Sequence, residues 1–114
     1  MVKAKYDVVR GLYQEPGIGF DINGPFSVST FSLRPVTYST TATLSSSSIV
    51  FASASAAPFT LTLPDAGNSF GQQIIFKKID STGNAVTISP FGNQLIDGSS
   101  LLQITSPNNS YTII

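Results

Sequence analysis

Short runs of alternating apolar and polar residues make up most of this chain after residue 35. Residues 59–63 alternate Phe, Thr, Leu, Thr and Leu, and residues 85–89 place Val86 and Ile88 at every second position. Such alternation puts every second side chain on one face of an extended strand. Clusters of Gly, Pro, Asn, Asp and Ser end these runs, and no segment combines helical periodicity with helix caps. The sequence therefore predicts an all-β fold, as a short-stranded sandwich or a β-prism-like domain.

The run at residues 73–79 differs from the others because both of its faces are largely apolar. Ile74 and Phe76 share one face with Lys78, whereas Ile75 and Ile79 share the other with Lys77. We expect this strand to be buried on both sides or to lie at a subunit contact. Further strands are expected at residues 26–33, 36–44, 48–52, 59–63, 85–89, 95–96, 101–105 and 111–114. The candidates for the core or for a trimer contact are Leu61, Leu63, Ile74, Ile75, Phe76, Ile79, Val86 and Ile88.

The first 35 residues are organised differently from the rest. Gly and Pro interrupt them repeatedly, which rules out a long helix, and short extended pieces are expected at residues 6–10 and 20–22. We divide the chain into an N-terminal arm or collar at residues 1–35 and a β-module at residues 36–114. The alternative is that residues 1–35 are ordinary strands that pack onto the same domain.

Composition narrows the possible functions. Charged residues are 11% of the chain, against about 25% in ordinary soluble domains. The six Lys and Arg residues form no stripe, which argues against nucleic-acid binding, and no apolar run is long enough to predict membrane insertion. Cys and His are both absent, which excludes the common zinc sites and Cys- or His-based nucleophilic catalysis. The absence of Cys and of an apolar leader fits synthesis in a reducing cytoplasm.

Three aspartates are the remaining candidates for chemistry. Asp65, Asp80 and Asp97 each stand at a strand end beside Gly, Ser or Asn. Capping of a turn explains them better than a pair of glycosidase carboxylates does. The stretch at residues 80–84 likewise fits a turn better than a calcium loop, which needs several carboxylates. We therefore expect no enzyme activity, metal or cofactor. Lys77 or Lys78 is expected to be a solvated strand residue or an edge-protecting charge, with a receptor contact as the alternative.

One pattern resembles a known class of module. The motif T-L-T-L-P, then G, then I-x-x-K-K-x-D-S-T-G-N-A-V-T-I-x-P, then I-D-G spans residues 60–98. It is similar to the β-modules of bacteriophage tail fibres, tailspikes and head decorations. The resemblance implies a homotrimer with its sheets about a threefold axis, and it implies no catalytic residue. The chain stops where many such modules carry a further hairpin.

The length suits a capsid decoration (cement) protein or a short head fibre, made in the host cytoplasm and carried on the virion. Its arm would dock on the major capsid protein, with contacts expected at Tyr6, Arg10, Tyr13 and Arg34 because interfaces favour Tyr and Arg. The alternatives are a receptor-binding or spacer module of a tail fibre or tailspike, and a fragment of a polysaccharide-degrading tailspike. In the receptor-binding case, exposed loops would contact a host surface glycan through Thr82, Asn84, Phe91 and Asn93, although Phe91 could equally fold onto its own core.

Overall fold

The structure is a computed structural model, and it describes residues 4–8, 11–14, 23–45 and 48–114. The chain divides into two compact units, Met1–Phe31 and Ser32–Ile114. This division falls four residues before the end of the expected arm.

The first unit contains an antiparallel hairpin of β1 (Ala4–Asp7) and β2 (Gly11–Gln14). The register pairs Tyr6 with Leu12 and Tyr13 with Lys5. The extended piece expected at residues 6–10 thus coincides with β1 only in part, and Arg10 and residues 20–22 lie outside the described residues.

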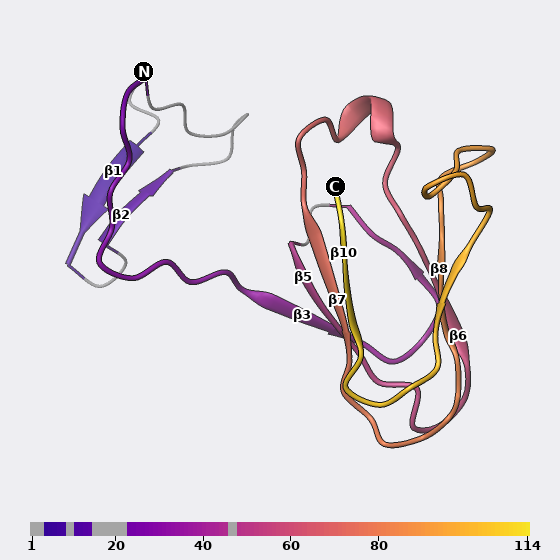
Figure 1. Cartoon of the computed structure of the whole chain (residues 1–114). Helices are drawn as coiled ribbons and strands as arrows, with labels where there is room; N and C mark the ends of the chain where they lie inside the picture. The colour runs from indigo at the N-terminus through magenta and orange to yellow at the C-terminus, as the bar shows by residue number, and fades with distance from the viewer. Residues whose placement is uncertain (1–3, 9–10, 15–22, 46–47) are drawn as a thin grey trace. The chain divides into compact units, whose positions relative to one another are not determined.

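The second unit is built from eight strands in two four-stranded sheets, which confirms the all-β prediction (Figure 1). Sheet 1 has the order β10-β7-β5-β3 and sheet 2 the order β4-β6-β8-β9. The strands are β3 (Pro35–Tyr38), β4 (Ala42–Thr43), β5 (Ile49–Ala52), β6 (Phe59–Thr62), β7 (Ile74–Lys78), β8 (Val86–Ser89), β9 (Leu102–Ile104) and β10 (Ser110–Ile113). The one helical turn described is the 3-10 helix η1 (Ala66–Asn68).

The chain alternates between the two sheets as it runs from β3 to β8. Within each sheet these strands are parallel, so that β3, β5 and β7 stack in sheet 1 and β4, β6 and β8 stack in sheet 2. Each pair of consecutive strands is therefore one coil of a short two-sided β-solenoid. This is more specific than the predicted sandwich or prism, because alternation alone does not distinguish parallel from antiparallel pairing.

The last coil runs in the opposite direction. Strand β9 is antiparallel to β8, and β10 is antiparallel to β7. The connection before β9 holds a tight turn, in which Ile96 and Ser99 exchange two backbone hydrogen bonds of 2.8 Å. Asp97 and Gly98 form this turn with positive φ values of 48° and 81°, as expected for Asp-Gly in a two-residue reversal. The strand expected at residues 95–96 is reduced to this single bridge.

The core lies between the two sheets and is lined by the inward-facing residues of every coil. Val50, Leu61, Phe76, Val86 and Ile88 are completely buried. All belong to the alternating positions of β5, β6, β7 and β8, so each strand contributes the face that its sequence predicts. The coils are thus held together by burial of apolar side chains, worth about 25 cal/mol per Å² removed from water.

Two further expected strands differ in the structure. The run at residues 36–44 is divided into β3 in one sheet and β4 in the other, so the chain turns a corner between Tyr38 and Ala42 while both side chains stay packed against the core. Residues 26–33 form no strand, although their spacing predicted one. Strand pairing needs a neighbour to hydrogen-bond with, and no described strand pairs with these residues.

Candidate functional site

The outer face of sheet 2 carries only polar side chains at its aligned positions. One row across the sheet is Thr43, Thr62 and Ser89, and the next is Thr60, Thr87 and Gln103. Gln103 Nε2 donates to Thr87 Oγ1 over 3.3 Å within the second row. These hydroxyl and amide groups can hydrogen-bond to water, so this face is suited to remain exposed to solvent.

The outer face of sheet 1 is mixed and, unlike that of sheet 2, carries large apolar side chains on its central strands. The row that crosses β3, β5, β7 and β10 reads Pro35, Ile49, Ile75 and Thr112, and the next reads Thr37, Phe51, Lys77 and Ser110. Ile79 follows β7 on the same side and is 43% exposed. We call Pro35, Ile49, Phe51, Ile75 and Ile79 the outer patch.

The outer patch lies opposite a face that is already packed. Val50, Ala52, Ile74, Phe76 and Lys78 alternate with its members and point into the core. The side chains of the patch therefore receive no cover from the second sheet, and Ile49, Phe51 and Ile75 are only half-buried. Lys77 is the one charged residue in the two rows that cross the patch. An exposed apolar patch of this kind, bordered by Thr37, Lys77, Ser110 and Thr112, is suited to bind another apolar surface.

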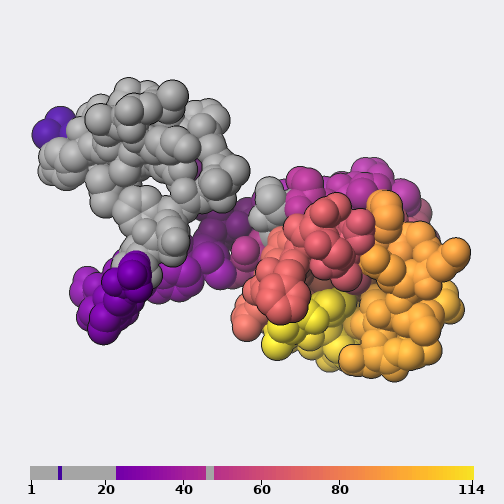
Figure 2. Space-filling view, turned by 90° about the horizontal axis from the view of Figure 1, so that it is seen from above, coloured from indigo at the N-terminus to yellow at the C-terminus, as the bar shows by residue number. Residues whose placement is uncertain are grey.

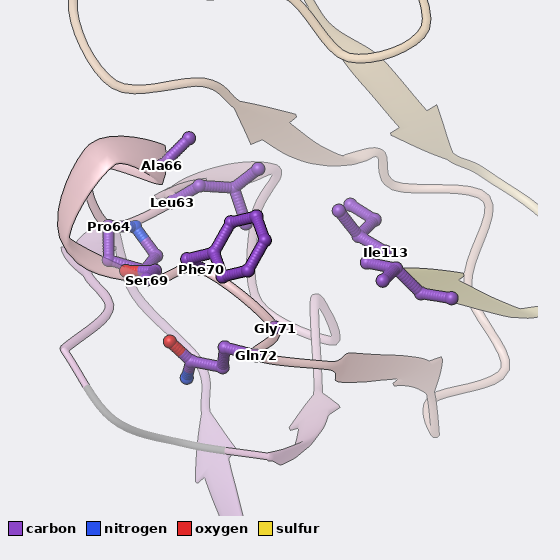
Figure 3. Close-up of a pocket in the computed structure, with 9 residues that line it drawn as sticks. Leu63, Pro64, Ala66, Ser69, Phe70, Gly71, Gln72 and Ile113 are labelled. Carbon is purple, nitrogen blue, oxygen red and sulfur yellow. The ribbon is translucent and has the colours of Figure 1, made fainter.

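A second apolar feature lies at one end of the second unit, between η1 and the end of β10. Here a hollow of about 400 Å³ opens beside Phe70, whose side chain is fully exposed (Figure 3). Figure 2 shows the two segments that border it, the loop of η1 and the C-terminal strand, next to each other. Among the described residues, no ionisable side chain lines the hollow. Its lining residues are Leu63, Pro64, Ala66, Ser69, Phe70, Gly71, Gln72, Ile113 and Ile114.

Asp65 holds the loop that carries this hollow. Its carboxylate accepts the backbone N–H of Gly67 at 3.0 Å and so caps the N-terminus of η1. Gln94 adds a second contact, because its Nε2 donates to Asp65 Oδ1 over 2.8 Å while its Oε1 accepts the N–H of Ala66. Asp65 therefore acts as a turn cap, the role that its position predicted.

Lys78 forms the most buried polar contact of the described residues. Its side chain is fully buried, and Nζ donates to Asp80 Oδ2 over 2.7 Å and to the carbonyl oxygen of Thr82 over 2.6 Å. The expected solvated lysine is therefore Lys77, which is exposed, and not Lys78. The alternation of β7 places Lys78 on the core face with Ile74 and Phe76, and a buried ammonium is tolerated only when it is paired and hydrogen-bonded.

Asp80 joins this ion pair to the neighbouring coil. Its Oδ1 accepts the N–H of Ala54 at 2.8 Å, and its Oδ2 accepts both the N–H and the hydroxyl of Thr82. Asn84 Nδ2 in turn donates to the carbonyl oxygen of Ala54 over 2.8 Å. The turn after β7 is thus fastened to the segment after β5, which explains why its sequence is rich in short polar residues.

The pKa of Asp80 follows from these contacts. Burial alone would raise it, because desolvation penalises the charged carboxylate. The hydrogen bonds from Lys78, Thr82 and the backbone of Ala54 act in the opposite sense and outweigh burial, so the pKa lies well below its ordinary value of 3.8. A carboxylate with so low a pKa is permanently charged at neutral pH and is poorly suited to act as a general acid or base.

The other expected exposed-loop residues divide into two groups. Thr82 and Asn84 are half-buried and belong to the Asp80 network, so they are not free loop-tip groups. Phe91 and Asn93 are exposed, with Phe91 at 46%, which rules out its being folded into the core.

The expected capsid contacts are dispersed through the N-terminal part of the chain. Tyr6 and Tyr13 lie on the two strands of the hairpin, Arg34 is exposed directly before β3, and Arg10 lies outside the described residues. Among the eight core or trimer candidates, Leu61, Leu63, Ile74, Phe76, Val86 and Ile88 are buried, whereas Ile75 and Ile79 lie in the outer patch.

Sequence reasoning missed two features of this surface. Gln94 has no motif that marks it as a clamp on Asp65, which lies 29 residues earlier. The contrast between the two outer faces is visible in the sequence, since the outward positions are Ile49, Phe51 and Ile75 in one sheet and threonines in the other. Without the register, however, these residues cannot be assigned to one face.

The chain matches no protein-family model, no curated protein and no solved structure among those with which it was compared. No helix among the described residues is long and apolar enough to cross a membrane. No group of three or more acidic, His or Cys side chains is gathered for metal binding in the described part of the chain.

Proposed function

We propose that this protein is a non-enzymatic structural component of a bacteriophage particle, and that it assembles as a homotrimer through the outer patch of sheet 1. Its most suitable place is the capsid exterior, as a decoration protein or short head fibre. In this role the N-terminal segment binds the major capsid protein, and the β-module holds the copies together.

The contrast between the two outer faces carries this proposal. Sheet 2 presents threonine, serine and glutamine, whereas sheet 1 presents the outer patch with a single lysine. A second copy offers the same apolar chemistry, and burial of these faces against each other removes apolar area from water without requiring charge complementarity. A trimer about a threefold axis buries one patch from each copy.

The absence of suitable chemistry among the described residues favours binding over catalysis. Asp65 and Asp80 are both engaged in capping loops, and Asp97 forms a reversal at positive φ. The hollow beside Phe70 is apolar. These features support a hydrogen-bonded scaffold that binds other copies through its outer patch.

The assembly is tested by reducing the apolar character of the patch without disturbing the strand. Ile75→Thr keeps a β-branched side chain and therefore the strand preference. Each copy loses about 1 kcal/mol of apolar burial, so we expect trimer dissociation to be favoured on the order of 100-fold, as measured by light scattering across a concentration series. Thr62→Val on the outer face of sheet 2 is the matched control and should leave the mass unchanged. Equal behaviour of the two variants would contradict the assignment of the patch.

The location on the particle is tested with purified protein and undecorated capsids. The full chain should cosediment with capsids, and Arg34→Ala should weaken cosedimentation while leaving the trimer mass unchanged. Binding to host cells with no binding to capsids would instead favour the receptor-binding module of a tail fibre.

A further inference from the structure

Residues 26–33 are an unusual segment, because they expose four large apolar side chains. Phe26 is 62% exposed, Val28 47%, Phe31 70% and Leu33 37%. None of these residues is in a described helix or strand. A soluble protein rarely leaves so many large apolar groups in one short stretch without a partner.

The sequence of the segment is that of a strand. Apolar residues alternate with Ser and Thr, and no charged residue occurs between Asp21 and Arg34. The alternation changes phase once, at Ser29 and Thr30, and a one-residue bulge there would bring all four apolar side chains to one face. What the segment lacks is a neighbouring strand to pair with.

The segment does not pair with β3, the adjacent strand of its own chain, in the structure. Only Arg34 separates it from Pro35, the first residue of β3. A residue before proline is restricted to extended conformations, and a hairpin needs at least two residues to reverse the chain. A hairpin with β3 would therefore use Ser32, Leu33 and Arg34 as its turn and could not pair the whole segment.

Strand β3 has a free edge that lacks a partner strand among the described residues. It is the outermost strand of sheet 1. Val36 stands opposite the fully buried Val50 on the core-facing side, yet 40% of Val36 is exposed because none of the described strands lies beyond it. One further strand at this edge would both satisfy the backbone and cover Val36.

We propose that residues 26–33 of one copy add as a β-strand to the free edge of β3 in a neighbouring copy. This arm exchange rests on the self-association proposed above and specifies a second contact of the same assembly. The occupant is a second copy because the donor segment and the acceptor edge are both uncharged, are both present once in every chain, and are not paired with each other within one chain in the structure. In a threefold ring each copy donates one segment and accepts one, so the exchange closes without free ends.

The exchange is tested by disulfide cross-linking, since the chain has no native cysteine. We would combine Thr37→Cys on β3 with a single cysteine at Ser27, Ser29 or Ser32, and oxidise the full-length protein. A disulfide requires Cα atoms within about 7 Å. Ser29 and Thr37 are eight residues apart, about 26 Å when the chain between them is extended, so an extended segment can form this disulfide only with another copy. At least one pair should give a covalent trimer on a non-reducing gel.

Two control variants test which strand accepts the segment. Thr112→Cys replaces Thr37→Cys to place the thiol on β10, at the other edge of sheet 1, and Thr87→Cys places it on the outer face of sheet 2. Neither should cross-link to the segment. Cross-linking to β10 in preference to β3 would overturn the proposal, and so would a disulfide that forms only within one chain.

Hydrogen exchange supplies an independent readout on the same full chain. The amides of β3 should exchange at least tenfold faster in a Phe26→Ser, Phe31→Ser double variant than in the parent protein. A trimer without β3 cross-links or β3 protection would overturn arm exchange and leave the proposed self-association standing. A monomeric parent protein would contradict both arm exchange and the proposed self-association.

Discussion

Replacement of Asp80 by Asn should destabilise the second unit far more than replacement of Lys78 by Met. Asp80 is 4% exposed and Lys78 fully buried, and their charges are 2.7 Å apart. Asn has nearly the same shape as Asp, so the change removes the negative charge and leaves the ammonium of Lys78 without a counter-ion. Removing one member of a buried ion pair typically costs about 3–5 kcal/mol.

Replacement of Lys78 by Met instead leaves Asp80 without its lysine partner. In Lys78→Met the carboxylate of Asp80 keeps the N–H of Ala54 and both the N–H and the hydroxyl of Thr82. A charge that retains three donors is largely compensated, and the methionine fills the space of the lysine stem. We expect a cost of about 1 kcal/mol for this variant.

The assay is thermal unfolding at one fixed protein concentration and pH 7, because association also affects stability. About 1 kcal/mol shifts the midpoint of a domain of this size by roughly 4–8 °C. A loss of about 3 kcal/mol therefore lowers the midpoint by roughly 12–24 °C for Asp80→Asn. The double variant should recover most of this loss, because it buries no unpaired charge. Equal costs for the two single variants, or additive costs in the double variant, would refute this account of the ion pair.

Three further predictions concern the turns. The folded pKa of Asp80 lies below its ordinary value of 3.8, so the charged carboxylate stabilises the fold above that pH. This contribution is lost as pH falls through the lower folded value. Asp80→Asn should remove this acid dependence in unfolding measured between about pH 6 and pH 2. Asp65→Ala should cost about 1 kcal/mol in urea unfolding, since it removes both the cap of η1 and the partner of Gln94; no change would refute the clamp. Gly98→Ala should cost about 1 kcal/mol because its φ is +81°, whereas Gly83→Ala, at a position with equal space and no positive φ, should be nearly neutral; a neutral Gly98→Ala would contradict the turn assignment.

The sequence predicts most strands because apolar residues recur at every second position, even in β5 and β7, where residues between them are also apolar. The core faces of β6, β7 and β8 are as expected, and Asp65 and the Asp97–Gly98 reversal lie in turns that their residue types predict. The coil topology could not be predicted, since parallel and antiparallel strands share the same alternation and only long-range pairing distinguishes them.

Lys78 shows why the rest of the candidate site could not be predicted from the sequence. A lysine in an alternating strand is expected to face solvent. The burial of Lys78 depends on Asp80, Thr82 and the backbone of Ala54 meeting at one point. Ala54 precedes Asp80 by 26 residues and is brought to it only by the stacking of successive coils. The same stacking collects Ile49 and Ile75 into one outer row, so the candidate site is a property of the register.

The mass of the intact protein in solution tests the central claim most directly. Light scattering coupled to size exclusion should give about 36 kDa, three times the 12.0 kDa of one chain, and Ile75→Thr should shift the distribution toward one chain at low concentration. A mass of 12.0 kDa for the parent protein up to millimolar concentration would contradict assembly through the outer patch.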